Sequence, residues 1–532
     1  MESPKPSMPE VSESERSPLV DALLELIAWQ QKQIEELEQQ ILKLKGETTK
    51  PKIKPSTLDK KTDSDDDKDT KDEDENKGKK KGPKRKKTEQ LPIHKTEIIE
   101  PDVVPEGSVF KGYRDVVVQD LVIQPHNTCY RLAQYETADG SYVTGKLPAG
   151  IRDGHGGKEL HGFILYQYHH QHVTQPLLLE FLRDLGVDIS SGELSHLLTR
   201  KLDQFHEEKA EILSVGLAVS PILHTDDTGA RHAGKSGYCT PIGNELFAWF
   251  SSTESKSRIN FLECLSQGVE RRYVLNEGAL EYLAQQKLPK RLQAGLNTVQ
   301  VDLDNQEAWD HWLTAQGITR SRHRKIVTEG ALIGGLLAQG IPSELVIMSD
   351  DAGQFNVFDH ALCWIHAERV INRLIPLNEG HEKAVKWVRE QLWQLYADIK
   401  GYKLNPQPAQ AEEIRARFEE LCRTQTCYAT LNQALKRLGD NQQELLRVLD
   451  KPWIPLHNNL SERDIRDYVK KRKISGSTRS EAGRKSRDTF ASLKKTCRKH
   501  GLSFWHYLRD RLSGAAQIPR LSELIHQAAT CG

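Results

Sequence analysis

The sequence predicts an α/β protein in which a catalytic core is interrupted by a helical insertion and preceded by a coiled coil and a helix-turn-helix region. Two observations predict the core, because apolar, strand-like runs end in adjacent aspartates at Asp226–Asp227 and again at Asp350–Asp351. A third observation, helix-periodic sequence within 370–455, predicts the insertion. With 532 residues, of which 37% are hydrophobic, the chain is too long for one compact domain, and about three to four units are expected.

The overall composition excludes several classes of protein. Lysine and arginine together equal aspartate and glutamate at 75 each, so the chain as a whole is not a uniformly basic binder. Its eight cysteines form no CxxC pair, which argues against a disulfide framework or a cysteine-rich zinc module and fits a reducing compartment. The sequence has no apolar run of about 18 residues, and its first residues lack the features of a secretory signal. We therefore expect a cytoplasmic protein with no membrane partner.

Residues 18–47 are predicted to form a short coiled coil. Over about three heptads, the repeating positions alternate at spacings of three and four. Isoleucine at a and leucine at d favour a parallel two-stranded coil, hence a homodimer or higher oligomer. The alternative is a lone amphipathic helix that packs on its own chain. The repeating residues are Val20, Ile27, Ile34 and Ile41, with Leu23, Gln30, Leu37 and Leu44 as companions.

Residues 48–96 are predicted to be a disordered, charged linker. Within it, 59–90 contains no hydrophobic residue, and acids fill its first half whereas basic residues fill its second half. Such a segment buries too little apolar surface to offset the entropy of ordering. Its basic half either contacts DNA phosphates or is solvated. The next segment, 97–150, is predicted to be a β-rich N-terminal domain, because YRDVVVQDLVI and SYVTGKL flank an ADG turn at 138–140.

Residues 151–210 are predicted to form a helix-turn-helix region. Thr174 can cap the second helix, Gly186 turns the chain, and Ser190 or Ser191 can cap the third helix. If the third helix enters the major groove of DNA, it offers its polar and basic residues to the bases and phosphates. The alternative is that these helices only pack together. The residues offered are Ser195, His196, Thr199, Arg200 and Lys201.

The first part of the catalytic core is predicted over 211–369. A short buried strand that ends in a carboxylate places that group at the edge of a sheet, and carboxylates that converge there repel one another unless a cation lies between them. Their oxygens suit Mg²⁺ or Mn²⁺. The strand-like runs GYCTPIGN and LFAWFSS follow the first acid, Asp226, and predict the opening strands of a ribonuclease H-like sheet.

A third acid lies in the segment HNNLSERDIRDYVKKRK. Asn458 or Asn459 can cap a helix at this point. Glu462 then shares one helical face with the apolar residues three and seven positions further on. The alternative is that Glu462 forms a surface ion pair with Arg466.

A basic stretch over 463–499 holds 14 lysine and arginine residues against four acids. A local excess of this size indicates a nucleic-acid surface, and the alternative is a solvated helix face. The stretch belongs to the last part of the predicted core, 456–515, and residues 516–532 form a C-terminal tail. The residues predicted to contact DNA here are Arg463, Arg466, Lys470, Lys471, Arg472 and Lys473.

Taken together, these segments resemble the DDE transposases of the insertion sequence 66 family. The matching pieces are DDTGAR, SDDAGQF, CWIHAER, NNLSER and GSTRSEAGRKSRDTFASLKKTCRKHGLSFWHYL, and the resemblance covers roughly residues 97–515. It implies a ribonuclease H-like core with Asp226, Asp350 and Glu462 as the acidic triad that holds two divalent ions, Mg²⁺ or Mn²⁺. The chain lacks the Cys-based zinc module that many members carry near the N-terminus.

The resemblance implies a bacterial transposase that cleaves DNA at the ends of its insertion sequence and transfers the strands into target DNA. One ion would activate a water or a 3′-hydroxyl, and the other would stabilise the leaving oxygen. The partners would be double-stranded DNA, the terminal inverted repeats and target DNA, in the cytoplasm and at the nucleoid. The alternatives are a DNA-binding or regulatory protein that has lost catalysis, and a glycosidase, which the aromatic content of 7% and the basic stretch disfavour.

The same resemblance assigns residues beside the triad. Asp227 and Asp351 are the second choices within the two pairs of aspartates. His366 could orient a phosphate or a water, and Arg369 could bind phosphate; the alternative is that this stretch only packs, with His366 as a satisfied polar neighbour. Asn459 is a further candidate neighbour of the site.

Overall fold

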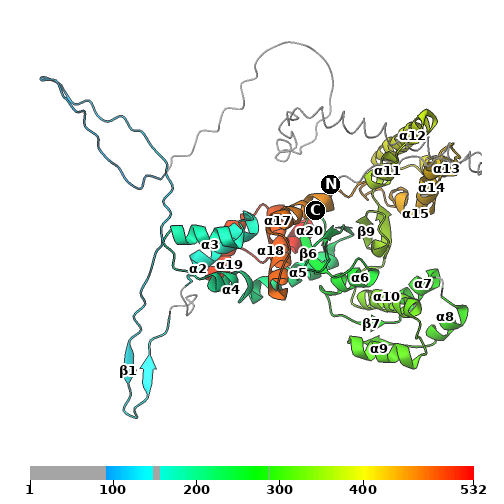
Figure 1. The fold of residues 1–532 in the computed structure, drawn as a ribbon, viewed down its shortest axis with the longest axis horizontal. Helices are drawn as coiled ribbons and strands as arrows, with labels where there is room; N and C mark the ends of the chain where they lie inside the picture. Colours follow the sequence, from blue (N-terminus) through cyan, green and yellow to red (C-terminus); the bar gives the residue numbers. More distant parts are fainter. Residues whose placement is uncertain (1–91, 148–155, 287, 532) are drawn as a thin grey trace, which may run out of the picture. The chain divides into compact units, whose positions relative to one another are not determined.

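The computed structural model describes residues 92–147, 156–286 and 288–531, so the predicted coiled coil and most of the predicted linker lie outside the described residues. The chain divides into two compact units, 1–118 and 119–532. The described residues of the first unit are exposed and form no helix or strand. The second unit holds every helix and strand of the described chain (Figure 1).

The second unit begins with a β-hairpin at the turn that the sequence predicts. Strands β1 (Gln134–Glu136) and β2 (Tyr142–Thr144) pair antiparallel around the ADG segment, where Gly140 adopts a φ of 78°. The carboxylate of Asp139 accepts the N–H of Ser141 at 3.3 Å, which fits a turn residue. The other described residues of 97–147 form no helix or strand, so the predicted β-rich domain is reduced to this hairpin.

A helical region follows the hairpin. Its elements are α2 Lys158–Leu165, the π-helical turn η3 Tyr166–His170, α3 Gln175–Asp184, α4 Ser191–Thr199 and α5 Asp203–Val219. Thr174 precedes α3, and Gly186 adopts a φ of 84° just after it. The hydroxyl of Ser190 accepts the N–H of Glu193 at 3.1 Å and so caps α4. The helix starts, the turn at Gly186 and the cap at Ser190 are as predicted, whereas the side chain of Thr174 makes no capping bond to α3.

A mixed six-stranded sheet forms the centre of the second unit. Its strands are β3 Ile222–Thr225, β4 Thr228–Gly229, β5 Tyr238–Gly243, β6 Ala248–Thr253, β9 Val346–Ser349 and β10 Asp359–Leu362. On one side of β3 lie β9 and then β10, all parallel; on the other lies β5, antiparallel to β3 and paired with β4 and β6. Because parallel neighbours end at the same edge, the residues that follow β3 and β9, Asp226 and Asp350, lie at one edge of the sheet.

Helix α18 (Glu481–Lys499) covers the free edge of β6. Three polar residues spaced four apart on α18 each accept a backbone N–H from alternate residues of β6. Four helical residues rise about 6 Å and two strand residues about 6.6 Å, so the two rows stay in step. This closes an edge that would otherwise be unpaired. The bonds run from Ser252 N to Asp488 Oδ2 at 2.8 Å, from Phe250 N to Ser492 Oγ at 2.9 Å and from Ala248 N to Thr496 Oγ1 at 3.2 Å.

A first insertion, which the sequence did not reveal, separates β6 from β9. It comprises α6 Arg258–Ser266, β7 Tyr273–Val274, α7 Glu277–Gln285, α8 Lys290–Leu296, β8 Asp302–Leu303, α9 Gln306–Ala315 and α10 Ser321–Ala338. Trp309 of α9 is fully buried and stacks on Tyr273 of β7, with ring centroids 5.0 Å apart. Figure 1 shows α7, α8 and α9 in green around α10.

A second helical insertion lies where helical periodicity predicts it. It comprises α11 Trp364–Asn372, α12 Glu379–Leu404, α13 Pro408–Arg423, α14 Ala429–Asp440, α15 Gln442–Leu445 and α16 Arg447–Asp450. The periodic segments EKAVKWVREQLWQLYADI and AEEIRARFEELC fall within α12 and α13. These helices, coloured from yellow-green at α11 to orange at α15 in Figure 1, share a hydrophobic core of their own around Phe418 and Leu431.

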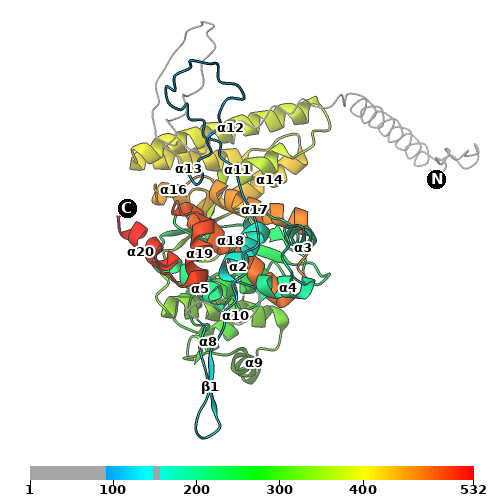
Figure 2. The same ribbon diagram turned by 90° about the vertical axis from the view of Figure 1, so that its left-hand side faces the viewer.

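The C-terminal helices return to the sheet. They are α17 Asn459–Ser475, α18, α19 Phe504–Ser513 and α20 Leu521–Cys531, and Figure 2 shows α17, α18 and α19 with α5. Glu208, buried on α5, accepts the hydroxyl of Tyr507 and the N–H of Leu521, and it forms an ion pair with Arg511 at 2.9 Å. The predicted tail therefore carries a helix that packs on α5.

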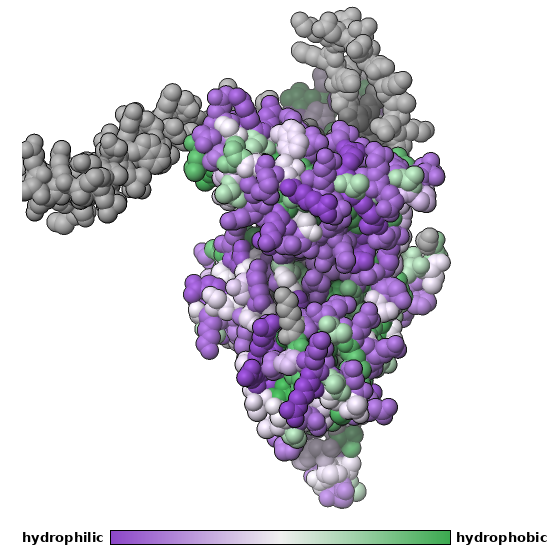
Figure 3. All heavy atoms as spheres, turned by 90° about the vertical axis from the view of Figure 1, so that its right-hand side faces the viewer, coloured by the Kyte–Doolittle hydropathy of each residue, from purple (hydrophilic) through white to green (hydrophobic). Residues whose placement is uncertain are grey.

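The surface and the interior are sharply different in polarity. The face shown in Figure 3 is mainly hydrophilic, and its hydrophobic patches are small and separate. Apolar side chains gather instead in two large cores. One is shared by the helical region, the sheet, the first insertion and the C-terminal helices, and the other lies within the second insertion. Among the described helices, none combines the length and apolarity needed to cross a membrane.

Candidate active site

The three predicted acids come from three segments that the fold brings to one end of the sheet. Asp226 follows β3, Asp350 follows β9, and Glu462 lies in the first turn of α17. Burial is the largest cause that raises the pKa of Asp226, to about 6, and the N–H of Asp227 opposes it. The negative charges of Asp350 and Glu462 raise that pKa further. Asp226 is thus partly buried and within electrostatic reach of the other acids.

The two aspartates at the end of β3 have different partners. The hydroxyl of Thr240 donates to Oδ1 of Asp227, and Nε2 of Gln354 donates to its Oδ2 at 2.7 Å. Oδ1 of Asp226 accepts the N–H of Asp227 at 2.7 Å, and no described side chain donates a hydrogen bond to Asp226. The carboxylate of Asp226 therefore keeps lone pairs for a ligand, whereas protein donors already occupy both oxygens of Asp227.

The two aspartates at the end of β9, Asp350 and Asp351, also differ in their partners. Asp351 forms an ion pair with Arg437 of α14, from Nε to Oδ2 at 2.5 Å, and thereby ties the second insertion to this loop. Oδ1 of Asp350 accepts the N–H of Ala352 at 3.2 Å, a bond within the turn itself. Asp350 is therefore the freer acid of the two.

Glu462 does not pair with Arg466, the partner expected if it formed a surface ion pair; it contacts two residues of another helix. Nη1 of Arg369 lies 2.9 Å from Oε1 of Glu462, and Nε2 of His366 lies 3.4 Å from the same oxygen. Both partners come from α11, so the CWIHAER segment does lie beside the third acid. Burial lowers the pKa of His366, while Glu462 opposes that shift. The expected alternative partner, Arg466, is exposed.

A residue that the sequence marked only as a helix cap joins these segments. Asn458 is fully buried, and its side chain makes no capping bond to α17. Its Oδ1 bonds to Nδ1 of His224 at 2.9 Å, and its Nδ2 donates to the carbonyl of Thr225 at 2.7 Å. Both partners belong to the last two residues of β3. The candidate neighbour Asn459, by contrast, is exposed at the start of α17.

The acids suit a divalent cation in donor type and charge. Carboxylate oxygens are the hard ligands that Mg²⁺ and Mn²⁺ take. Burial is the main cause of the raised pKa of Asp226, and the charges of Asp350 and Glu462 add to it, so a cation at this place would balance negative charge. Their spacing is wider than a shared ion needs, because no group of three or more His, Cys, Asp or Glu residues in the described chain is close enough to hold a metal. Arg369 and His366 hold Glu462 in this arrangement.

The cations of the basic stretch divide into an exposed and a buried set. Four of them on α17 are exposed and recur at spacings of three, four and three, which places them on one face of the helix. The buried set lies on the inner side of α17 and along α18. The exposed residues are Arg463, Arg466, Lys470 and Lys473, and the buried ones are Lys471, Arg487, Lys494 and Lys495.

Lys471 and Arg472, which were predicted to bind DNA, instead donate hydrogen bonds to other parts of the protein. Lys471 is only 5% exposed; its Nζ donates to the carbonyl of Tyr168 at 2.7 Å and lies over the ring of the same residue. Arg472 is half-buried and donates to the carbonyl of Gly229 and to the hydroxyl of Thr228. The amphipathic face of α17 explains the difference, because every third or fourth residue must turn inward.

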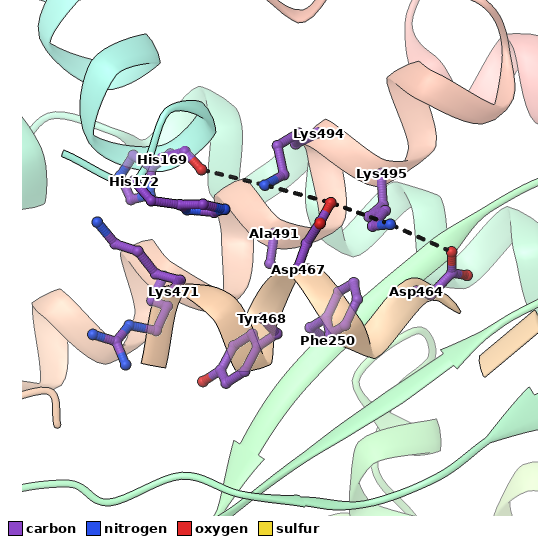
Figure 4. A pocket seen from close by; sticks show the side chains of 11 residues that line it. His169, His172, Phe250, Asp464, Asp467, Tyr468, Lys471, Ala491, Lys494 and Lys495 are labelled. Atoms are coloured by element: carbon purple, nitrogen blue, oxygen red, sulfur yellow. Dashed lines mark hydrogen bonds and ion pairs between the residues drawn. The ribbon is translucent and has the colours of Figure 1, made fainter. Parts of the chain in front are cut away.

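The buried cations surround a small cavity between η3, α17 and α18 (Figure 4). Its volume of about 20 Å³ is room for little more than one water. Burial lowers the pKa of Lys471 to about 7 and that of Lys494 to about 8. None of the three predicted acids lines this cavity, so it is separate from the candidate active site.

The helix-turn-helix residues lie at the end of α4. His196, Arg200 and Lys201 are exposed, and Ser195 and Thr199 are partly buried. Lys201 adopts a φ of 55°, which sets it apart from the helix proper. Binding of DNA by this helix stays a prediction.

Comparison with known proteins places this site in a family. Residues 304–486 match the family model described as Transposase IS66 family, a range that includes Asp350 and Glu462 and begins after Asp226. The chain is also 42% identical over 304 residues to the uncharacterized protein y4jO of Sinorhizobium fredii (strain NBRC 101917 / NGR234). That similarity covers 57% of this chain and 94% of the relative. The chain therefore belongs to the IS66 transposase family.

Proposed function

We propose that the protein is a transposase that cleaves DNA at the ends of its insertion sequence and joins the freed strands to target DNA. The observation that carries this proposal is that Asp226, Asp350 and Glu462 lie at one end of the sheet. The strands before the two aspartates are parallel neighbours, and the residue before α17, Asn458, bonds to the end of β3. Family membership supports a transposase-type function.

The strand order supports a ribonuclease H-like core. The chain enters the sheet at β3, continues through the antiparallel β5 and β6, and then places β9 and β10 in parallel on the other side of β3. This order puts the first strand in the middle, so one acid follows the central strand and the next follows its parallel neighbour. The sequence predicted such a sheet from its first three strands.

We propose Mg²⁺ or Mn²⁺ as the cofactor, with two ions per site. Bound ions would supply an activated water or 3′-hydroxyl and stabilise the leaving oxygen. Asp226 and Asp350 would hold them through the oxygens that protein donors leave free. Glu462 would complete the site after parting from Arg369, which would then be free to bind a DNA phosphate.

DNA would reach the site along α17. Its exposed cations begin at Arg463, next to Glu462, and end at Lys473, a length of about 15 Å along the helix. Phosphates are the groups that such a row recognises. Arg200 and Lys201 would add contacts from the helix-turn-helix region. The partners proposed are double-stranded DNA with terminal inverted repeats, target DNA and a second copy of the chain.

The test is nicking of a DNA that carries the terminal inverted repeats of the element, measured with and without Mg²⁺. Metal-dependent cleavage at the repeat ends that disappears in Glu462→Gln would support the proposal. Specific binding to the repeats without any cleavage, in the wild type and with either metal, would favour the alternative of a DNA-binding or regulatory protein that has lost catalysis.

A further inference from the structure

All four polar groups of Asn458 bond to segments that carry the candidate site. Its side-chain Nδ2 donates to the carbonyl of Thr225, the residue before Asp226, and its Oδ1 bonds to His224. Its backbone N–H donates to Sγ of Cys363 at 3.2 Å, at the start of α11. Its carbonyl accepts the N–H of Glu462 at 3.3 Å. One buried residue thus bonds to three parts of the chain that are far apart in sequence.

These bonds fix the orientation of the amide group. Because Nδ2 is the donor to Thr225, Oδ1 must be the acceptor, and Nδ1 of His224 must be the donor to it. The asparagine amide offers a donor and an acceptor on two separate atoms, so it can bond to both partners at the same time. An aspartate would set a carboxylate oxygen against the carbonyl of Thr225, and a leucine would leave both partners buried without a bond.

We propose that Asn458 is a positioning residue that sets the distance between Asp226 and Glu462 for metal binding. The proposal rests on the proposed function, because it concerns the same acids. Asp226 is bonded covalently to the residue whose carbonyl Asn458 holds, and Glu462 is one helical turn after Asn458. A shift of Asn458 therefore moves the first and third acids relative to each other. Groups that orient metal ligands in this way change metal affinity by about 10- to 100-fold when they are removed.

Two variants and a matched control test the proposal. Asn458→Asp keeps the shape and the acceptor but loses the donor, and Asn458→Leu keeps approximate size and loses both. Asn276 is the control, because its side chain also joins a carbonyl, Gly334 O at 2.9 Å, to a helix N–H, that of Ala279 at 3.0 Å, but within the first insertion. Each protein is measured by thermal unfolding, by calorimetric titration with Mn²⁺ in the absence of DNA, and by the kinetics of DNA cleavage.

The expected result separates affinity for metal from affinity for DNA. Both Asn458 variants should bind Mn²⁺ about tenfold or more weakly, with a lower kcat and a KM for DNA changed by less than about twofold. Higher Mn²⁺ should restore part of the activity of Asn458→Asp. Asn276→Leu should lose thermal stability but keep the Mn²⁺ affinity and kcat of the wild type.

Asp226→Asn, measured beside them, separates two kinds of failure. If the wild type neither binds Mn²⁺ nor cleaves DNA, the proposed function itself fails. If Asp226→Asn keeps both Mn²⁺ binding and cleavage, Asp226 is not a metal ligand, and the positioning role is overturned with it. If Asp226→Asn loses both while the Asn458 variants keep wild-type Mn²⁺ affinity and kcat, only the positioning role is overturned. If Asn458→Asp does not fold, Asn458 holds the fold rather than the metal ligands, and the positioning role is likewise overturned.

Discussion

Asp226 and Asp227 are adjacent at the end of β3, yet their surroundings suit them to different tasks. Protein donors occupy both oxygens of Asp227, whereas no described side chain donates to Asp226. At the end of β9, the ion pair between Asp351 and Arg437 makes the same distinction in favour of Asp350. An acid whose oxygens both accept bonds from protein donors has fewer lone pairs left for a metal ion, so the surroundings rank the two acids of each pair.

This ranking predicts which substitutions abolish cleavage. Asp226→Asn, Asp350→Asn and Glu462→Gln should each lower kcat by about 10³-fold or more, with losses that do not add, because the acids act as one unit. Asp227→Asn and Asp351→Asn should be much milder and serve as matched controls. Cleavage is measured with Mg²⁺ and Mn²⁺, beside a DNA-binding assay that should be little changed. Loss of cleavage in Asp227→Asn with retention in Asp226→Asn would reverse the ranking.

The raised pKa of Asp226 predicts a stability effect with a definite sign. Its pKa in the fold is about 6, above the ordinary value of 3.8, so the folded state binds the proton more tightly than the unfolded state. The contribution of Asp226 to the free energy of unfolding is therefore highest below pH 4, and it is lost as the pH rises through 6. Asp226→Asn removes the charge, so at pH 8 in EDTA the free energy of unfolding should increase by about 1–3 kcal/mol. The gain should shrink at pH 4.5. Asp351→Asn, measured by the same denaturant titrations, should show no gain.

The three acids were predicted from the sequence, but the residue that joins their segments was not. Asp226 and Asp350 were marked by the apolar runs that they end, and the family resemblance assigned Glu462 to the same site. Asn458 stands 233 residues from Thr225 and 234 from His224, so nothing local in the sequence marks its side-chain bonds. Only the pairing of strands and the return of α17 to the sheet bring these groups together.

At the level of the element, α17 shows why a basic stretch is not a uniform surface. Its cations alternate between solvent and interior with the period of the helix. The polar residues of α18 look solvated in sequence but bond to the edge of β6. Helical periodicity identified α12 and α13, whereas α7, α8 and α9 were missed, because they are short helices inside the predicted first part of the core, for which no helices were predicted. Local patterns thus predicted helices better than they predicted what each helix face contacts.

The exposed row on α17 predicts the salt dependence of DNA binding. Replacing Arg463, Arg466, Lys470 and Lys473 by glutamine should weaken binding to any DNA sequence, because each neutralised phosphate releases counterions. The slope of log K against log salt should fall by about 2 to 4. The control is a pair of exposed lysines on α12, Lys386 and Lys400, replaced by glutamine. Equal slopes for the two sets, measured by fluorescence anisotropy, would mean that α17 does not contact DNA.

The inward side of α17 predicts a pH effect of opposite sign to that of Asp226. Burial, with the charges of Arg487 and Lys494, lowers the pKa of Lys471 to about 7, below its unfolded value of about 10.4. Between pH 7 and 10 the unfolded state binds more protons, so this residue makes stability rise with pH, by at most about 1.4 kcal/mol per unit. Lys471→Met should flatten that rise in urea titrations. Lys470→Met, at an exposed position, should leave the rise in place.

At the scale of the whole molecule, both insertions reach the loop that carries Asp350. Nη2 of Arg258, on α6 of the first insertion, donates to the carbonyl of Gly353 at 2.6 Å. Arg437, on α14 of the second insertion, pairs with Asp351. The loop after β9 is therefore held from two sides by segments that are far from it in sequence. The insertions contribute to the geometry of the site as well as to the size of the protein.

At the scale of the whole molecule, the sequence also predicts that copies of the chain assemble. The heptads of 18–47 lie outside the described residues and predict a parallel coil. A second observation comes from the described chain: Val116, Val118, Leu121 and Val122 are each more than 75% exposed. Contiguous exposed apolar residues mark interaction surfaces. The segment 97–123 carries six acids against two cations, so a protein partner suits it better than DNA.

Removal of the heptads should therefore dissociate the protein. The full chain should be a dimer or larger by multi-angle light scattering, and a variant that lacks residues 1–50 should shift toward the mass of a monomer, because the coil supplies the parallel contact between copies. Ile27→Lys with Ile34→Lys should act like the deletion by placing charge in the apolar seam, whereas Lys32→Ala and Lys43→Ala, outside the repeating positions, should not. A monomeric mass for the full chain would refute the coil as an assembly element. A deletion variant that stays dimeric would instead assign the contact to the exposed apolar segment at 97–123.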